Sequence, residues 1–156
     1  MDLDRFDRQL LNLVQEDSGQ TAEGLAQQVE LSPSAIQRRL RRMRDEGVIV
    51  RDCALVDPAS VGRPNVFVVA LQVERERADL LVLLRKWLAG EAHVQQAFYV
   101  TGEADFMLIV TAPGTEAFEA LMSRMMRENP NVRRYTTHVA LGVIKRGLTL
   151  PVPLEP

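Results

Sequence analysis

The stretch SPSAIQRRLRRMRDEG, residues 32–47, carries five arginines between positions 38 and 44 and predicts a helix with two unlike faces. Ser32 is a favourable N-cap, and Pro33 suits the first helical position because its missing N–H would have no partner there. Gly47 can adopt the left-handed conformation that ends a helix. At 100° per residue, one side of this helix is apolar and is expected to pack on its own domain. That side consists of Ile36, Leu40 and Met43.

The opposite face of this helix is polar and basic. It is formed by Ser34, Arg38, Arg41 and Asp45, with Gln37 and Arg42 beside it. Such a face can simply be solvated, but solvated faces usually alternate acidic and basic residues, whereas this run holds no acid before Asp45. Because the whole chain has a net charge of −2, the positive charge is local. A local basic patch is typical of a surface that meets a polyanion.

Two further helices are predicted before the arginine-rich one. The first is indicated by apolar residues at three- and four-residue steps. These are Leu3, Phe6, Leu10, Leu13 and Val14. The second follows the N-cap Thr21 and is expected to bury Leu25, Ala26 and Val29. Three helices with a short turn between the last two predict a helix-turn-helix unit, whose final helix enters the major groove of DNA.

The exposed N-terminal part of the arginine-rich helix is expected to lie nearest the bases. Ser34, Gln37 and Arg38 can hydrogen-bond to base edges or phosphates. Ser32 stands at the helix N-terminus, where free backbone N–H groups favour a phosphate.

The remaining arginines are not equivalent. Arg41 and Arg42 are expected mostly on phosphates. Arg39 and Arg44 fall nearer the apolar edge, so we expect their stems to pack on the domain and their guanidinium groups to pair with acids. The expected DNA-binding set is therefore Ser32, Ser34, Gln37, Arg38, Arg41 and Arg42.

The second half of the chain predicts a β-α-β-β-α-β order. Strands are expected over residues 66–73, 94–100, 105–111 and 132–145, and helices over 77–88 and from an N-cap at Thr115 to Asn129. This order is typical of a ferredoxin-like domain, in which two helices cover one face of the sheet. The other face is then left for a partner.

The expected fold class is α+β, with a three-helix, winged-type helix-turn-helix domain joined by a linker strand to a ferredoxin-like βαββαβ domain. The expected domains are residues 1–50 for DNA binding, 51–65 for the linker strand and hinge, and 66–146 for ligand binding and oligomerisation. Residues 147–156 form a proline-rich tail, either loose or strapped onto a neighbour.

Enzymatic, metal and membrane functions are not expected. A metal or nucleophilic site would need His93, His138 and Cys53 to converge, and no phosphate loop or dinucleotide fingerprint is present. We therefore expect no catalytic residue, no metal ligand and no cofactor. A single cysteine fits a reducing compartment, and no apolar run has the length of about 20 residues that spans a bilayer. With no secretory leader recognised, a cytoplasmic location without membrane partners is expected.

Three segments together resemble the Lrp/AsnC family, the feast/famine regulators of bacteria and archaea. They are LDRFDRQLLNLVQEDSGQTAEGLAQQVELSPSAIQRRLRRMRDEGVI at residues 3–49, VTGEADFMLIV at 100–110 and RYTTHVALGVIK at 134–145. They occur in the family's order and spacing. The resemblance implies a DNA-binding transcriptional regulator whose C-terminal domain forms homodimers and higher assemblies, often four dimers in a ring. It also implies an amino-acid effector bound between dimers, which modulates assembly or DNA binding.

The resemblance also implies a position for the effector. The family's Gly-x-x-Asp turn corresponds to Gly102 and Asp105, with Thr101, Glu103 and Ala104 adjacent. An aspartate can hold an α-ammonium group, and the N–H groups of a turn can hold a carboxylate. On the last strand, Thr137 matches a family threonine, whereas the bulky Tyr135 replaces a small hydroxyl residue. A plain hairpin turn is the alternative for Gly102 and Asp105.

A second function stays open at this point. An architectural protein that compacts or wraps DNA without any effector would have the same helix-turn-helix and the same oligomerising domain. A DNA footprint or oligomer size that changes with added amino acid distinguishes the regulator from this alternative.

Overall fold

The computed structural model describes residues 2–74 and 78–155 and divides the chain into two compact units. The first unit, here the DNA-binding unit, contains residues 1–55 together with the C-terminal segment 146–156. The second, here the C-terminal unit, contains residues 56–145. The end of the chain therefore belongs to the same unit as its beginning.

Three helices build the DNA-binding unit. They are α1 (Arg5–Glu16), α2 (Ala22–Ala26) and α3 (Pro33–Asp45). The predicted caps are confirmed, since the hydroxyl oxygens of Thr21 and Ser32 accept backbone N–H groups of the first turns of α2 and α3. Gly47 follows α3 with a φ of 73°, a value that favours glycine. The buried apolar residues are Leu10, Leu11, Val14, Ala22, Leu25, Val29, Ile36 and Met43.

The predicted linker strand is wrong. Residues 50–57 have no regular secondary structure, and a 3₁₀ turn, η1 (Pro58–Val61), follows them. The stretch VIVRDCALV has the β-branched residues of a strand, but among the described residues no other strand lies beside it to share backbone hydrogen bonds. Local propensity alone does not make a strand when the partner is missing.

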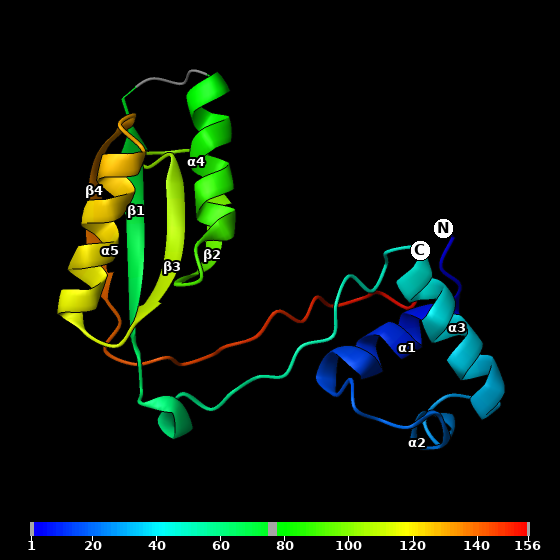
Figure 1. The fold of residues 1–156 in the computed structure, drawn as a ribbon. Coiled ribbons are helices and arrows are strands. Elements are labelled where there is room, and N and C mark those ends of the chain that lie inside the picture. The colour runs from blue at the N-terminus through cyan, green and yellow to red at the C-terminus, as the bar shows by residue number, and fades with distance from the viewer. Residues whose placement is uncertain (1, 75–77, 156) are drawn as a thin grey trace. The chain divides into compact units, whose positions relative to one another are not determined.

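The C-terminal unit has the predicted β-α-β-β-α-β order. Its elements are β1 (Asn65–Val73), α4 (Ala78–Gly90), β2 (Val94–Tyr99), β3 (Phe106–Ala112), α5 (Thr115–Glu128) and β4 (Val132–Val139). The sheet is antiparallel with the order β2-β3-β1-β4. Both helices lie on the same face of this sheet (Figure 1). The α+β class and the ferredoxin-like arrangement are confirmed.

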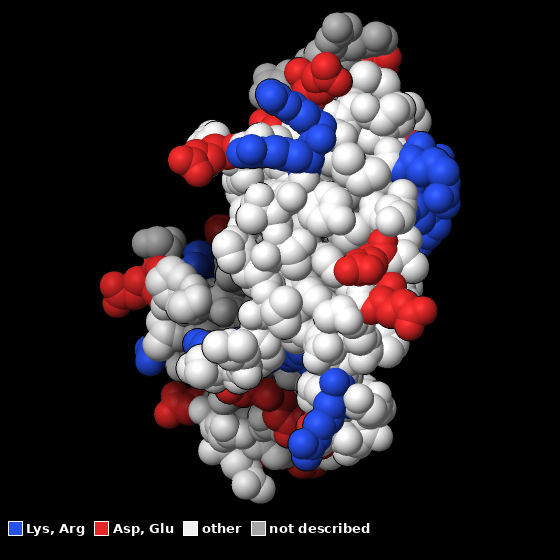
Figure 2. Space-filling model, turned by 90° about the vertical axis from the view of Figure 1, so that its left-hand side faces the viewer, with Lys and Arg blue, Asp and Glu red and all other residues white. Residues whose placement is uncertain are grey.

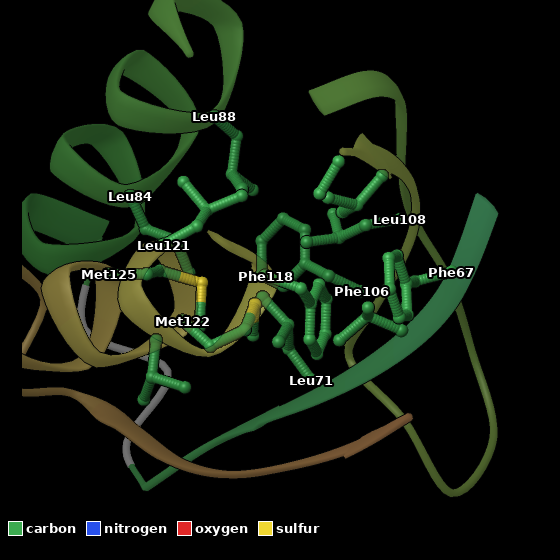
Figure 3. Close-up of a cluster of buried hydrophobic side chains, with 14 residues drawn as sticks. Phe67, Leu71, Leu84, Leu88, Phe106, Leu108, Phe118, Leu121, Met122 and Met125 are labelled. Carbon is green, nitrogen blue, oxygen red and sulfur yellow. The ribbon is translucent and has the colours of Figure 1, made fainter. Parts of the chain in front are cut away.

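Strict alternation along the two central strands places the core. Phe67, Val69 and Leu71 of β1 are buried, and they pair in register with Val110, Leu108 and Phe106 of β3. Because directly paired residues point to the same face, these six side chains form one layer beneath the helices. Figure 3 shows this layer interlocking with leucines of α4 and with Phe118 and the methionines of α5. The rings of Phe67 and Phe118 stack with their centroids 4.0 Å apart.

Several boundaries differ from the prediction, most of them by one or two residues, and two of these differences have a local cause. Thr115 is the first residue of α5 rather than its cap, because Gly114 occupies the N-cap position without a side-chain hydrogen bond. The last strand ends at Val139 rather than at residue 145, since its pairing with β1 ends at Phe67 and Val139, followed by one hydrogen bond from the Ala140 N–H to the Val66 carbonyl. The expected helix start at residue 77 lies outside the described residues. Over the described ranges, no helix is long and apolar enough to cross a membrane.

Candidate nucleic-acid interface and effector site

The exposed side of α3 carries the residues expected to face DNA. Ile36 and Met43 are fully buried against the other two helices, so the opposite side of α3 points away from the domain. Ser34, Gln37 and Arg38 are all exposed there. Arg38 forms no ion pair with any residue in the described ranges, which leaves its guanidinium group available to a ligand.

Arg41 is almost equally available. Its Nε lies 3.8 Å from Asp45 Oδ2, and the two side chains are 85% and 70% exposed. An ion pair this exposed contributes little to stability and is easily exchanged for a phosphate. At the start of the helix, the Ser32 hydroxyl lies 3.3 Å from the Ala35 N–H and 3.1 Å from the Ser34 hydroxyl. The capping hydroxyls and the basic face thus stand on the same helix.

Arg39 and Arg42 are held by the buried carboxylate of Asp7 on α1. Arg39 Nη1 lies 2.9 Å from Asp7 Oδ1, and Arg42 Nη2 lies 2.6 Å from Asp7 Oδ2. Arg39 also contacts Asp4 at 2.7 Å and stacks over the Phe6 ring at 5.7 Å from its centroid. The carboxylate of Asp7 therefore fastens α1 to α3 with both of its oxygens.

This network divides the five arginines of α3 into those that pair with acids and those that stay available. The prediction that Arg39 and Arg44 pair with acids is confirmed, since Arg44 contacts Asp52 at 3.2 Å. Arg42, expected on a phosphate, donates at least one N–H to Asp7. A phosphate would therefore share the Arg42 guanidinium group with that carboxylate. Of the five arginines of α3, Arg38 and Arg41 are exposed without a strong partner in the described residues.

Two acidic residues at the start of α1, its N-cap Asp4 and Asp7 of its first turn, were missed at the level of sequence. Asp4 and Asp7 form a reciprocal capping box, in which each carboxylate accepts the other's backbone N–H. Their Asp-x-x-Asp spacing at a helix start is a detectable signal for such a cap. Burial raises the pKa of Asp4, but the Asp7 N–H and the Arg39 guanidinium outweigh it and hold that pKa below its ordinary value. The hydrogen bonds to Asp7 and Asp4 raise the pKa of Arg39.

The Gly-x-x-Asp turn connects β2 to β3 at one end of the sheet. Gly102 has a φ of 118°, which strongly favours glycine at this position. The half-buried Asp105 is built into the sheet, because its N–H donates to the Leu71 carbonyl at 2.9 Å and its Oδ2 accepts the Val73 N–H at 2.7 Å. Its other carboxylate oxygen has no hydrogen-bond partner in the described part of the chain. Asp105 thus braces the turn with one carboxylate oxygen, and its other oxygen is not used in the described residues.

Tyr135 and Thr137 lie on β4, on the other side of β1 from the turn. Tyr135 pairs with Leu71, and Thr137 pairs with Val69. Both side chains therefore point to the helix-covered face of the sheet, at its edge strand β4. The Thr137 hydroxyl is buried and finds no hydrogen-bond partner among residues 2–74 and 78–155. Buried hydroxyls are rarely left unpaired, so this oxygen is a candidate contact for a ligand or another chain.

Gln72 links the turn to β4 across β1. Its amide nitrogen donates to the Glu103 carbonyl of the turn, and its amide oxygen accepts Arg134 Nε at 2.8 Å. This link lies on the sheet face opposite the one to which Tyr135 and Thr137 point, because Gln72 and Arg134 alternate with Leu71 and Tyr135 along the strands. Gln72 and Arg134 were missed, because only the strand register brings them together. In the described ranges, no group of three or more acidic, His or Cys side chains could hold a metal.

Within the described residues of the C-terminal unit, no helix covers the second face of the sheet, and its central part is apolar. Val68 and Ala70 of β1 lie there beside Met107 and Ile109 of β3, and Phe98 of β2, half exposed, pairs with Met107. Figure 2 shows, on another side of the C-terminal unit, a broad uncharged area with charged residues near its margins. Clustered apolar residues at the surface, such as those of β1 and β3 named above, are typical of an interface.

The chain matches known proteins over both units. A winged helix-turn-helix DNA-binding family matches residues 3–50, and the Lrp/AsnC ligand-binding domain matches residues 66–150. The chain belongs to the Lrp/AsnC family of transcriptional regulators. It is 43% identical to an HTH-type transcriptional regulator of Sinorhizobium fredii over 99% of this chain and 90% of that protein.

Solved structures of this family have the same architecture. An AsnC-family regulator from Agrobacterium tumefaciens has a TM-score of 0.88 and 30% identity, covering 96% of this chain and 97% of its own. A regulator from Neisseria meningitidis in complex with L-methionine has a TM-score of 0.86 and 27% identity, covering 99% and 98%. As a member of the family, this protein is a DNA-binding transcriptional regulator.

Proposed function

We propose that this Lrp/AsnC regulator binds an amino acid at the end of β1, and that the ligand changes its assembly or its DNA binding. Two observations carry the proposal: the Thr137 hydroxyl on β4 has no partner in the described residues, and Asp105 of the turn has one carboxylate oxygen without a hydrogen bond there. The carboxylate suits an α-ammonium group, and the N–H groups of the 101–104 turn suit an α-carboxylate. The methionine complex of the Neisseria relative supports the ligand class.

The proposal includes assembly of several copies. The uncovered face of the sheet pairs naturally with the same face of a second copy, giving a homodimer with two recognition helices for the half-sites of a pseudo-palindrome. Further association of dimers, up to an octamer, would enclose the effector site. The regulator would act in the cytoplasm on double-stranded DNA, without a catalytic step or a cofactor.

The roles on DNA belong to the same proposal. Ser34, Gln37 and Arg38 would lie nearest the bases, because they are exposed toward the start of α3. Arg41 would bind a phosphate, joined by Arg42 to the extent that Asp7 releases it. Ser32 would present the helix N-terminus to a phosphate.

Calorimetric titration of the full chain with each of the twenty amino acids tests effector binding. Asp105→Asn keeps an oxygen for the Val73 N–H but removes the charge, so we expect at least a tenfold loss of affinity with the fold retained. Thr137→Val removes a buried hydroxyl that has no partner, so it should weaken ligand binding while leaving stability equal or higher.

Two results would contradict this proposal. Absence of binding by all twenty amino acids removes the effector. A DNA footprint and an oligomer size that stay unchanged in the presence of a bound amino acid favour the architectural, effector-independent function instead.

A further inference from the structure

The C-terminal residues Leu-Pro-Val-Pro, 150–153, lie along α1 of the DNA-binding unit (Figure 1). Asn12 and Gln15 each use both ends of the side-chain amide on one residue of this segment. Asn12 donates to the Val152 carbonyl at 2.9 Å and accepts the Val152 N–H at 3.1 Å. Gln15 does the same with Leu150 at 3.0 and 2.8 Å. Two side chains thus recognise the backbone of an extended segment as a neighbouring strand would.

A third side chain and an apolar contact complete the site. Arg8 donates from Nη1 to the Pro153 carbonyl at 3.2 Å, and it is fixed from the other side by the Leu3 carbonyl, which accepts its Nε at 3.2 Å. Positions 8, 12 and 15 are four and three residues apart, which places them in one row on a helix. The Val152 side chain packs against the apolar core of the unit. The row, here the α1 docking row, is a site for an extended peptide.

The prolines of the segment match this site. Leu150 and Val152 present N–H groups to α1, whereas Pro151 and Pro153 between them have no N–H to leave unsatisfied. Proline also restricts the free segment to extended conformations, so less conformational entropy is lost on docking. The alternation therefore supplies donors only where α1 supplies acceptors.

We propose that the α1 docking row is a binding site for the chain's own segment 150–153, which straps the DNA-binding unit. The C-terminal unit lies between these two parts in the sequence. Docking therefore closes a loop, and the DNA-binding unit has two connections to the C-terminal unit, through residues 50–57 and through residues 140–149. Asp7 on the same helix holds Arg39 and Arg42 of α3. The strap thus binds the helix that anchors the DNA-recognition helix.

Hydrogen exchange followed by mass spectrometry on the full chain tests the strap. A C-terminal peptide is informative because Pro151 and Pro153 carry no amide hydrogen. Within residues 150–153, the measured exchange therefore comes from Leu150 and Val152 alone. We expect the amides of Leu150 and Val152 to exchange at least tenfold more slowly than in an unstructured peptide. The double variant Asn12→Ala/Gln15→Ala should remove this protection.

A matched pair of variants at Leu150 separates backbone recognition from side-chain packing. The Leu150 side chain is 71% exposed, so Leu150→Ala should retain the protection of Val152. Leu150→Pro removes the N–H that Gln15 accepts and should release the segment. Unprotected Leu150 and Val152 amides in the unmodified protein would overturn the proposal. Protection that survives Asn12→Ala/Gln15→Ala would overturn the assigned docking row.

Cross-linking identifies whose segment occupies the site. With Cys53 replaced by serine, cysteines are introduced by Glu16→Cys and Thr149→Cys, both exposed neighbours of the Gln15–Leu150 contact. A short bismaleimide should give a cross-linked species that runs as a monomer in denaturing gels. Only dimeric cross-linked species would show that a second copy provides the segment and would overturn the assignment to the same chain.

Discussion

The two units of this regulator are held together by different physical means. In the C-terminal unit, a sheet layer and two helices enclose an apolar core that includes a stacked pair of phenylalanines. In the DNA-binding unit, the apolar core is smaller, and a fully buried carboxylate, Asp7, joins α1 to α3 through two arginines. A small helical domain has little apolar area to bury, so paired charged residues contribute to its packing.

The largest expected loss of stability comes from removing a large side chain from the apolar core. Phe67→Ala removes a buried ring that stacks on Phe118, so we expect a loss of about 4 kcal/mol in the free energy of unfolding of the C-terminal unit. Scanning calorimetry should show one transition lowered while the transition of the DNA-binding unit keeps its midpoint. Val82→Ala on the exposed side of α4 is the control and should cost less than about 0.5 kcal/mol. Equal shifts of both transitions would mean that the units do not unfold separately.

The next effect is expected from the buried carboxylate. Asp7→Asn keeps the shape but removes the charge that pairs with Arg39 and Arg42, so the DNA-binding unit should lose roughly 3 kcal/mol. This value lies at the low end for a broken buried pair, because both arginines keep some contact with water. Chemical denaturation monitored by helical circular dichroism measures it. A loss below about 0.5 kcal/mol would show that the apolar contacts suffice without the network.

A smaller effect separates the arginines on DNA. Arg41→Ala should reduce the slope of log K against log salt by about one on all sequences, because one phosphate contact is lost. Gln37→Ala should instead alter sequence preference. Arg39→Ala should act mainly through stability, since Asp4 and Asp7 already hold its guanidinium. Binding titrations at several salt concentrations distinguish these outcomes, and identical behaviour of all arginine-to-alanine variants would contradict the division.

The smallest effect concerns pH. The folded-state pKa of Asp4 lies below its ordinary value of 3.8, so the unfolded state binds a proton more readily than the folded state. The contribution of Asp4 to stability is therefore present above pH 3.8 and is lost as the pH falls through the lower folded-state pKa. Because Asp4 is half exposed, the effect should be small. Asp4→Asn should flatten this part of the stability–pH curve, and an unchanged curve would assign acid sensitivity to other carboxylates.

Local patterns predicted much of this molecule correctly. The caps of α2 and α3, the left-handed Gly47, the apolar side of α3 and the β-α-β-β-α-β order all depend on residues close in sequence. The division of α3 into a packed side and an exposed side also followed from helical periodicity alone. The linker strand predicted within residues 51–65 failed, because a strand needs a neighbour that the local sequence does not provide.

Contacts between distant residues were the part that sequence patterns did not reveal. The amide of Gln72 bridges Glu103 and Arg134 only because β1 lies between β3 and β4 in a particular register. Asp7 pairs with Arg39 and Arg42, and not with the other three arginines of α3, because α1 packs against α3 at these two residues.

The sequence by itself determined which segments are helices and strands and where the positive charge is concentrated, since capping, periodicity and charge are properties of neighbouring residues. Only the tertiary structure decided which arginines remain available to DNA, which hydroxyl is left unpaired and where the last residues bind. Those outcomes depend on which groups approach within hydrogen-bonding distance across 30 or more positions of chain, as between Asp7 and Arg39 or between Gln15 and Leu150.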